Sequence, residues 1–273
     1  MPFLTRRRKT GLVSVLLALF ALTAVEIEPT AANTIFFEDD FETCNYSKYA
    51  DVAFNQIDRT ISHSGQCSSK IGGNGIDFGK LIVRLPGSQA ELWFRAFVLF
   101  PSNFQLPVNS GGVHVGIHLW RFSNLDIQLD FNVPAGTDTI QLFHWPGSTG
   151  GEAVAPSTGF NPIAGGRRGR WQCWEVHSRL NQPGQKDGLV EFFADGNLVG
   201  SVSGSLRGNS TASYTLVDVQ SNIGGAGAVP PWPRDNWWYI DDVVVSTGRV
   251  GCPPNVTDNT PPNPPGGLRI NVP

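Results

Sequence analysis

The sequence GRWQCWEVHSRLNQPGQKDGLVEFFADG, residues 169–196, indicates the fold most directly. It contains two runs typical of β-strands, 171–180 and 188–194, and neither run has a helical period. It ends in Asp195-Gly196, a strong hairpin signal, because a type I′ turn needs positive φ at both central residues. The segment therefore predicts antiparallel strands joined by short connections.

Similar strand-like runs, separated by Gly, Pro, Asn and Asp, extend over most of the chain. They cover residues 34–37, 81–85, 91–100, 112–122, 126–131, 139–145 and 237–246. No stretch of twelve or more residues has a convincing period of 3.6, so we expect no helix as a main element. Many short strands in a chain of 273 residues predict an all-β sandwich or jelly roll.

The composition excludes several classes of function. Charged residues make up 16% of the chain and the formal net charge is -3, so we predict neither a nucleic-acid-binding surface nor a charge-rich disordered chain. The 31 Gly, 20 Pro and 8 Trp residues fit a protein with many turns and with aromatic side chains to spare for a surface. The sequence has no phosphate-binding glycine loop, no nucleophile elbow and no zinc signature.

The two ends of the chain differ from the strand-rich part. Residues 1–32 predict a secretory signal peptide. Four basic residues at 6–9 precede an apolar run over 11–25, and this run is too short to span a bilayer. Small residues at 30–32 predict cleavage before Asn33. Residues 253–273 are a Pro-rich tail or linker. We therefore expect one domain over 33–252 in a secreted, periplasmic or extracellular protein, with no membrane insertion of the mature chain.

All four cysteines lie in the predicted mature part, at Cys44, Cys67, Cys173 and Cys252. An even count without a C-x-x-C pair in an exported chain predicts two disulfides. Three connectivities are possible. Because Cys44 and Cys67 flank the N-terminal strands while Cys173 lies in a strand and Cys252 follows the last one, we favour 44–67 with 173–252.

Period-two alternation predicts which polar side chains share a face of a strand. It groups His114, His118 and Trp120; Asp126, Gln128 and Asp130; and Glu175, His177 and Arg179. Such a face suits a polysaccharide, since polar groups hydrogen-bond to hydroxyls and indoles stack on pyranose rings. The alternative is the solvated side of an antiparallel sheet.

The run of residues 169–184, followed by Asp-Gly at 187–188 and 195–196, resembles the G-x-W-x-x-x-E-x-x-x-K/R-L-N-x-P-G pattern of polysaccharide-lyase-like jelly rolls in the concanavalin A-like lectin and glucanase superfamily. Residues 91–100 resemble the early core strand of that superfamily, and residues 238–247 its closing strand. Over roughly residues 34–252, the resemblance implies a concanavalin A-like jelly-roll sandwich of two antiparallel sheets.

Lyases of this architecture abstract a proton α to a uronate carboxyl, so the resemblance implies a carboxylate neutraliser, a base and an acid. The catalytic candidates are His114, His118, Gln128, His177 and Arg179. The candidates for substrate binding are Arg95, Trp120, Asp126, Asp130 and Glu175. The Q-I-H triplet and the Y-x-K motif of alginate lyases are absent. The sequence therefore favours a secreted polysaccharide-binding protein, with a lyase that cleaves a uronate-containing glycan by β-elimination as the alternative.

Two further functions and one metal site stay open. The spacing of Asp126 and Asp130 matches the E-x-D-x-E motif of retaining glycoside hydrolases, but with shorter side chains. A cell-surface structural module would use the same fold without sugar chemistry. No cofactor is required, and Asp40, Glu42 and Asp242 could hold a structural calcium ion, because calcium takes clustered carboxylate oxygens. The alternative for these carboxylates is a solvated acidic edge.

Overall fold

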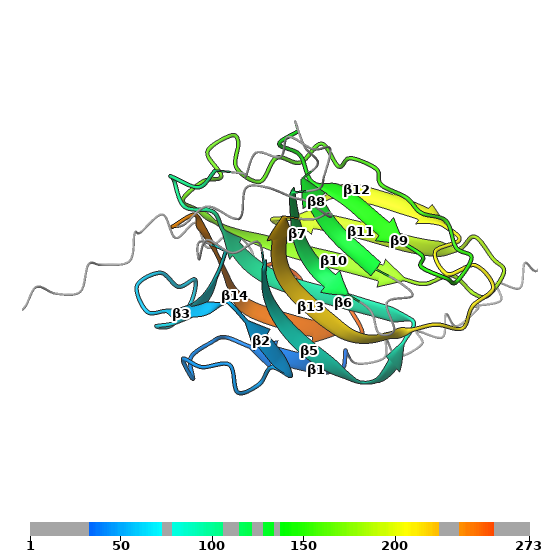
Figure 1. The fold of residues 1–273 in the computed structure, drawn as a ribbon, viewed down its shortest axis with the longest axis horizontal. Coiled ribbons are helices and arrows are strands. Elements are labelled where there is room, and N and C mark those ends of the chain that lie inside the picture. The colour runs from blue at the N-terminus through cyan, green and yellow to red at the C-terminus, as the bar shows by residue number, and fades with distance from the viewer. Residues whose placement is uncertain are drawn as a thin grey trace, which may run out of the picture. The chain divides into compact units, whose positions relative to one another are not determined.

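The computed structural model describes residues 33–72, 78–105, 115–121, 128–133, 137–223 and 235–253. Within these ranges the regular structure is entirely β, arranged as two antiparallel sheets (Figure 1). The predicted all-β jelly-roll sandwich is thereby confirmed. These ranges contain no helix long and apolar enough to cross a bilayer. The predicted signal peptide, residues 254–273 of the Pro-rich tail, His114 and Asp126 lie outside the described residues.

The first sheet has eight strands. In spatial order they are β12 (Asn197–Gly204), β11 (Gly188–Ala194), β10 (Trp171–Arg179), β6 (Glu91–Leu99), β14 (Trp237–Ser246), β4 (Ser68–Gly72) and β3 (Gln56–Asp58), with β1 (Ile35–Asp39) also paired to β14. The second sheet has six strands. Their order is β2 (Asp51–Ala53), β5 (Phe78–Gln89), β13 (Tyr214–Ile223), β7 (Val115–Arg121), β8 (Gln128–Val133) and β9 (Gln141–Trp145).

The hairpin between β11 and β12 forms as the sequence predicts. Asp195 has φ 49° and Gly196 has φ 79°, so both central residues are in the left-handed region that a type I′ turn requires. The turn is also fixed to β10, because the Cys173 N–H donates to Asp195 Oδ1 (2.9 Å) and the Asp195 N–H donates to the Cys173 carbonyl (2.8 Å). The Asp side chain thus stabilises both the turn and its position beside β10.

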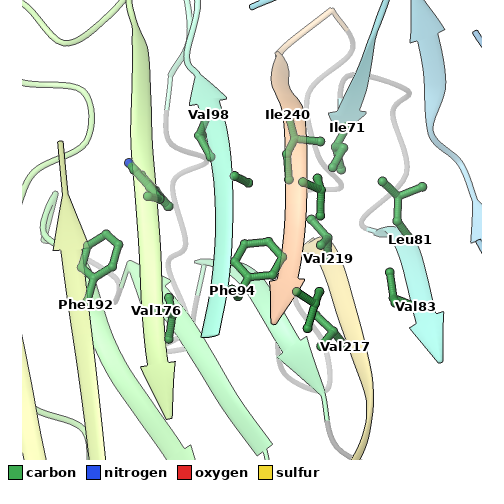
Figure 2. Close-up of a cluster of buried hydrophobic side chains, with 14 of the residues drawn as sticks. Ile71, Leu81, Val83, Phe94, Val98, Val176, Phe192, Val217, Val219 and Ile240 are labelled. Carbon is green, nitrogen blue, oxygen red and sulfur yellow. The ribbon is translucent and has the colours of Figure 1, made fainter. Parts of the chain in front are cut away.

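One hydrophobic core fills the space between the two sheets (Figure 2). Phe94, Val176 and Ile240 point into it from the eight-stranded sheet, while Leu81 and Val219 point into it from the six-stranded sheet. β6, β10 and β13 contribute alternate residues to this core, as the pleat requires. The sequence alternation therefore predicts correctly that each sheet has one apolar face.

Both disulfides have the predicted connectivity. Cys44 is bonded to Cys67 with a Cα–Cα separation of 5.6 Å, and Cys173 to Cys252 with a separation of 5.9 Å. The second bond closes a sequence separation of 79 residues and ties the chain that follows β14 to β10. In the chain-entropy account each bridge stabilises the fold by about 2 to 4 kcal/mol.

Replacing Phe94 by Ala should lower the free energy of unfolding by about 3 to 5 kcal/mol, because it leaves a cavity where both sheets meet. Chemical denaturation monitored by tryptophan fluorescence measures the change. Leu198→Ala is the control, since Leu198 is 53% exposed and its truncation should change stability by less than about 0.5 kcal/mol. Equal effects of the two substitutions would contradict this description of the core.

Candidate functional site

The structure divides the predicted site residues between two sheets. In the eight-stranded sheet lie Arg95 on β6 and Glu175, His177 and Arg179 on β10. In the six-stranded sheet lie His118 and Trp120 on β7 and Gln128 and Asp130 on β8. β10 therefore does not neighbour β7 or β8. Because both sheets turn their inner faces to one core, their outer faces point in opposite directions and cannot form one groove.

The outer face of the eight-stranded sheet is covered by the chain itself. We call residues 247–253, which follow β14, the C-terminal strap. Its Arg249 donates from Nη2 (2.8 Å) and Nε (3.0 Å) to Glu175 Oε2, and its Gly251 N–H donates to Glu175 Oε1 (2.8 Å). Glu175 is therefore only 1% exposed, although it is on the outer face. This carboxylate holds the strap in place and is not available to a polymer.

His177, next along the same face, is held on both ring nitrogens. Its Nε2 lies 2.7 Å from Glu91 Oε1, its Nδ1 lies 2.8 Å from Glu191 Oε2, and its ring stacks on Trp93 with centroids 4.3 Å apart. An imidazole with both nitrogens engaged and one face covered has no site left for a substrate proton. Glu91, Glu191 and Trp93 thus hold the imidazole in place, and its selection as a catalytic candidate stays a prediction.

The two arginines of this sheet contact neighbouring parts of the chain. Arg179 Nη2 donates to the Asp187 carbonyl (3.3 Å). The Arg95 guanidinium lies over the Phe97 ring at 5.4 Å, and burial lowers the pKa of Arg95 although the nearby carboxylates of Asp242 and Glu175 oppose that shift. Neither side chain faces the strands that carry His118 and Gln128.

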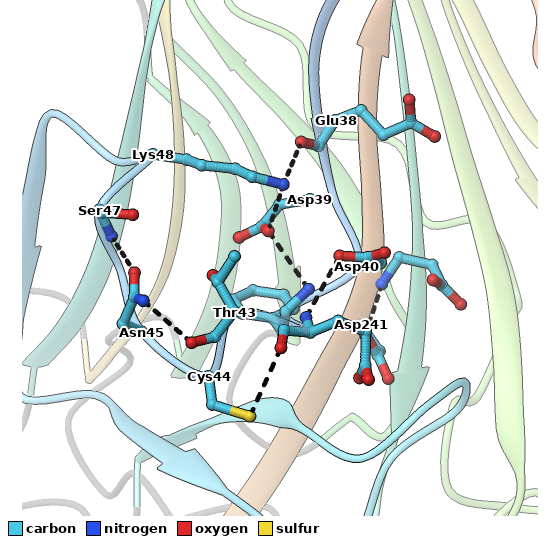
Figure 3. Close-up of polar contacts among 12 residues, drawn as sticks. Glu38, Asp39, Asp40, Thr43, Cys44, Asn45, Ser47, Lys48 and Asp241 are labelled. Atoms are coloured by element: carbon cyan, nitrogen blue, oxygen red, sulfur yellow. Dashed lines mark hydrogen bonds and ion pairs between the residues drawn. The ribbon is translucent and has the colours of Figure 1, made fainter.

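The predicted calcium ligands use their oxygens for hydrogen bonds to the protein. Asp40 Oδ1 accepts from the Glu42 N–H (3.2 Å), and Glu42 Oε1 accepts from the Gln66 (2.7 Å) and Cys67 (3.1 Å) N–H groups. Figure 3 shows this acidic segment, in which Lys48 also pairs with the buried Asp39 (2.9 Å). No group of three or more His, Cys, Asp or Glu side chains is placed to hold a metal ion in the described ranges. The calcium site stays a prediction.

The third predicted calcium ligand, Asp242, fastens a loop with its neighbour Asp241. Asp242 pairs with His63 Nδ1 (2.5 Å) and accepts from Ser64 Oγ (2.8 Å), while Asp241 Oδ2 accepts from the His63 N–H (2.7 Å). Burial, followed by the charge of Asp242, raises the pKa of Asp241 to about 8. Burial opposes ionisation of Asp242 as well, but its bonds to His63 and Ser64 lower the pKa of that carboxyl. The loop that contains His63 thereby covers more of the same outer face.

This pair of aspartates makes stability depend on pH. Because the pKa of Asp241 is 3.8 when unfolded and about 8 when folded, its contribution to stability is complete below about pH 4 and is lost as the pH rises to about 8. Asp241→Asn should therefore flatten the decrease in the free energy of unfolding over that range, as measured by denaturation at several pH values. The exposed Asp235→Asn should keep the wild-type slope, and an unchanged slope in Asp241→Asn would contradict the assignment.

The outer face of the six-stranded sheet is different because side chains remain accessible on it. On β9 Leu142 and His144 are buried in the core side, whereas Trp145, at the end of the strand, is 49% exposed. On β5 the same alternation buries Leu81 and leaves Arg84 exposed. Trp145 is not among the residues that the sequence analysis selects. Period-two alternation could have identified it, because positions 141, 143 and 145 lie on the opposite face of the strand from the apolar residues at 140 and 142.

Strand register aligns the other candidates on this sheet. Gln128 on β8 pairs with Trp145 on β9, and His118 on β7 pairs with Gln220 on β13, which pairs with Lys80 on β5. Directly paired positions are the closest cross-strand neighbours in a sheet. The register therefore brings the positions of His118, Gln220 and Lys80 side by side. Lys80 also forms an ion pair with the Asp51 carboxylate. Sequence reasoning missed Gln220 and Lys80, because neither strand assignment nor spacing relates β13 and β5 to β7.

Trp120 does not follow the simple alternation that groups it with His118. A register irregularity lies between Ile117 and Trp120, and Trp120 pairs with Leu129, which in turn pairs with the buried His144. A bulge adds one residue to a strand and so changes the period beyond it. The expectation that Trp120 shares a row of positions with His118 is therefore wrong.

The comparisons with known proteins identify the fold. The alginate lyase vAL-1 from a Chlorella virus aligns with a TM-score of 0.54 at 14% identity, over 79% of this chain and 100% of that one. The endo-β-1,4-glucuronan lyase from the fungus Trichoderma reesei aligns with a TM-score of 0.51 at 11% identity, over 79% and 96%. The binding domain of botulinum neurotoxin serotype C1 aligns with a TM-score of 0.52 at 10% identity, over 79% and 49%. No protein-family model and no curated protein sequence matches.

This chain therefore has the jelly-roll fold of polysaccharide lyases, as the sequence resemblance implies. The same comparison includes a binding domain of a toxin, so the fold does not determine whether a protein is an enzyme. The function therefore has to be inferred from the residues on the accessible face of the six-stranded sheet.

Proposed function

We propose that this protein binds a uronate-containing polysaccharide across the outer face of the six-stranded sheet. The observation that carries the proposal is the exposed Trp145, which pairs in register with Gln128 at the edge of that sheet. An indole offers a flat apolar surface for a pyranose ring, and an amide can donate to and accept from its hydroxyls. No cofactor is needed for this binding.

The cationic positions on this face favour an acidic polymer. Arg84 is exposed on β5, and Lys80 lies four residues before it on the same side of the strand. Arginine recognises carboxylates through two parallel hydrogen bonds, and lysine does so as a point charge. The alginate and glucuronan lyases that share the fold are named for uronate polymers, which supports the same class of ligand here.

A second function, polysaccharide cleavage by β-elimination, is favoured by the paired positions of His118, Gln220 and Lys80. In such a reaction a base removes the proton at C5 of a uronate, the electron pair forms the C4–C5 double bond, and the glycosidic oxygen at C4 leaves and takes up a proton. We assign His118 as the base and Gln220 as the group that hydrogen-bonds to the substrate carboxylate. Lys80 would stabilise the charge that develops.

The disulfides support an extracytoplasmic site of action for this protein. Both cysteine pairs are oxidised, and no free cysteine is present among the described residues. Disulfides persist mainly in oxidising compartments, where extracellular polysaccharides are also found.

Trp145→Ala should weaken binding to alginate oligosaccharides at least about tenfold, because a buried aromatic contact with the sugar is lost. Isothermal titration calorimetry measures the affinity. Thermal unfolding should be nearly unchanged, since Trp145 is half exposed in the free protein. Ile35→Ala is the control, because Ile35 is equally exposed but lies on the eight-stranded sheet. Equal affinities of all three proteins would contradict the proposed surface.

His118→Ala tests the second function separately. Incubation of the wild-type protein with alginate or polyglucuronate should increase the ultraviolet absorbance of the unsaturated product, and the variant should lose this activity at least about 100-fold while it still binds the polymer. Binding by the wild-type protein without any increase in absorbance would contradict the lyase function and leave the binding function in place.

A further inference from the structure

A surface depression of about 330 Å³ lies where the chain passes from the six-stranded sheet to β10. The residues that line it are Thr158, Gly159, Phe160, Asn161, Arg167 and Val199. Its volume is at the lower end of the range for small-molecule sites, which is enough for one sugar ring. It lies apart from the strands that carry His118 and Gln220.

We propose that this depression is a subsite for the carboxylate of a uronate residue, with Arg167 as the group that binds it. This inference rests on the proposed function, because it concerns the same polysaccharide at a second point on the surface. It adds a specificity determinant that neither the sequence motifs nor the residues on the strands supply.

The depression adjoins the β9 edge of the candidate binding face. One row of paired positions crosses the six-stranded sheet from Asn222 on β13 through Gly116 on β7 and Asn132 on β8 to Gln141 on β9. An isolated bridge then pairs Gln141 with Ser157. Ser157 immediately precedes Thr158, the first residue of the depression. The end of this row at the sheet edge is therefore next in the chain to the residues that line the depression.

The Arg167 guanidinium is held in place and still has donors available. It stacks over the Phe160 ring at 4.7 Å, and its Nη1 donates to the Asn161 (3.4 Å) and Ala164 (3.3 Å) carbonyls. A guanidinium has five N–H groups, and these contacts use only those of Nη1. The described residues contain no carboxylate paired with Arg167. Its remaining N–H donors can thus form bidentate hydrogen bonds to a carboxylate.

The backbone before Arg167 is shaped by glycines. Gly165 and Gly166 have φ values of 61° and 77°, in the region that favours glycine, and the Arg167 N–H closes the turn by donating to the Ala164 carbonyl (3.1 Å). A Cβ at Gly165 would lie 3.2 Å from Arg167 Nη1. The glycine at this position leaves space for the guanidinium beside Phe160.

The charge around the depression also favours an anion. Arg168 and Arg170 follow directly and are exposed, and neither forms an ion pair with the described residues. Three arginines within four residues attract a polyanion over a distance of about a Debye length. A neutral glycan would gain nothing from this charge, so we infer a preference for uronate polymers over neutral ones.

Arg167→Gln is the decisive variant, with the exposed Arg59→Gln as the control because it removes the same charge on the side of the eight-stranded sheet. We expect Arg167→Gln to weaken binding to alginate oligosaccharides about tenfold or more, and Arg59→Gln to change it less than about twofold. Arg167→Lys should bind more tightly than Arg167→Gln but more weakly than the wild-type protein, since an ammonium cannot form bidentate hydrogen bonds to a carboxylate. Unchanged thermal unfolding would show that the variants remain folded.

Normal alginate binding by Arg167→Gln would overturn the subsite and leave the proposed function intact. If the wild-type protein binds no uronate polymer, the proposed function fails, and the depression is then tested with sodium glucuronate. We expect glucuronate to shift the amide NMR signals of Gly159, Asn161 and Gly169 in the wild-type protein but not in Arg167→Gln. The absence of these shifts in the wild-type protein would overturn the subsite independently.

Discussion

The two sheets of this protein share one hydrophobic core, and this constraint decides where a ligand can bind. Among the side chains that the structure describes, the strands of both sheets turn their inner face to the core, so the two outer faces and the edges are left for function. On the eight-stranded sheet the outer face is occupied by the C-terminal strap and by the loop that contains His63. Glu175, Cys173 and Asp241 make the contacts that keep these segments in place. The six-stranded sheet and the edge beside β9 therefore carry the candidate site.

The sequence predicts much of the fold because the fold follows from local patterns. Residues 188–194 and 237–246 form strands with the expected bounds, and Asp195-Gly196 forms the expected turn. Residues 197–204 form β12, the second strand that the hairpin turn at 195–196 implies, whereas residues 214–223 form β13 outside the strand-like runs of the sequence. β12 contains glycines and serines in place of alternating apolar residues, and β13 has a polar residue between its valines. Pairing with neighbours, which the sequence does not reveal, stabilises both strands.

The candidate site could be predicted only in part, because alternation says which residues share a face of one strand but not which strands share a sheet. Glu175 and His177 have the residue types and spacing of a sugar site. Their true partners, Arg249 and Glu91, are 74 and 86 residues away in the chain. His118 and Gln128 do lie in one sheet. The bulge before Trp120 is a further feature that residue types do not reveal.

Hydrogen–deuterium exchange in the presence of alginate oligosaccharides would test most directly whether the six-stranded sheet is the binding face. We predict slower amide exchange in β9 and in residues 153–161, with no change in β10 and β11. Slower exchange confined to β10, β11 and the C-terminal strap would contradict it, because those segments form the covered face of the other sheet.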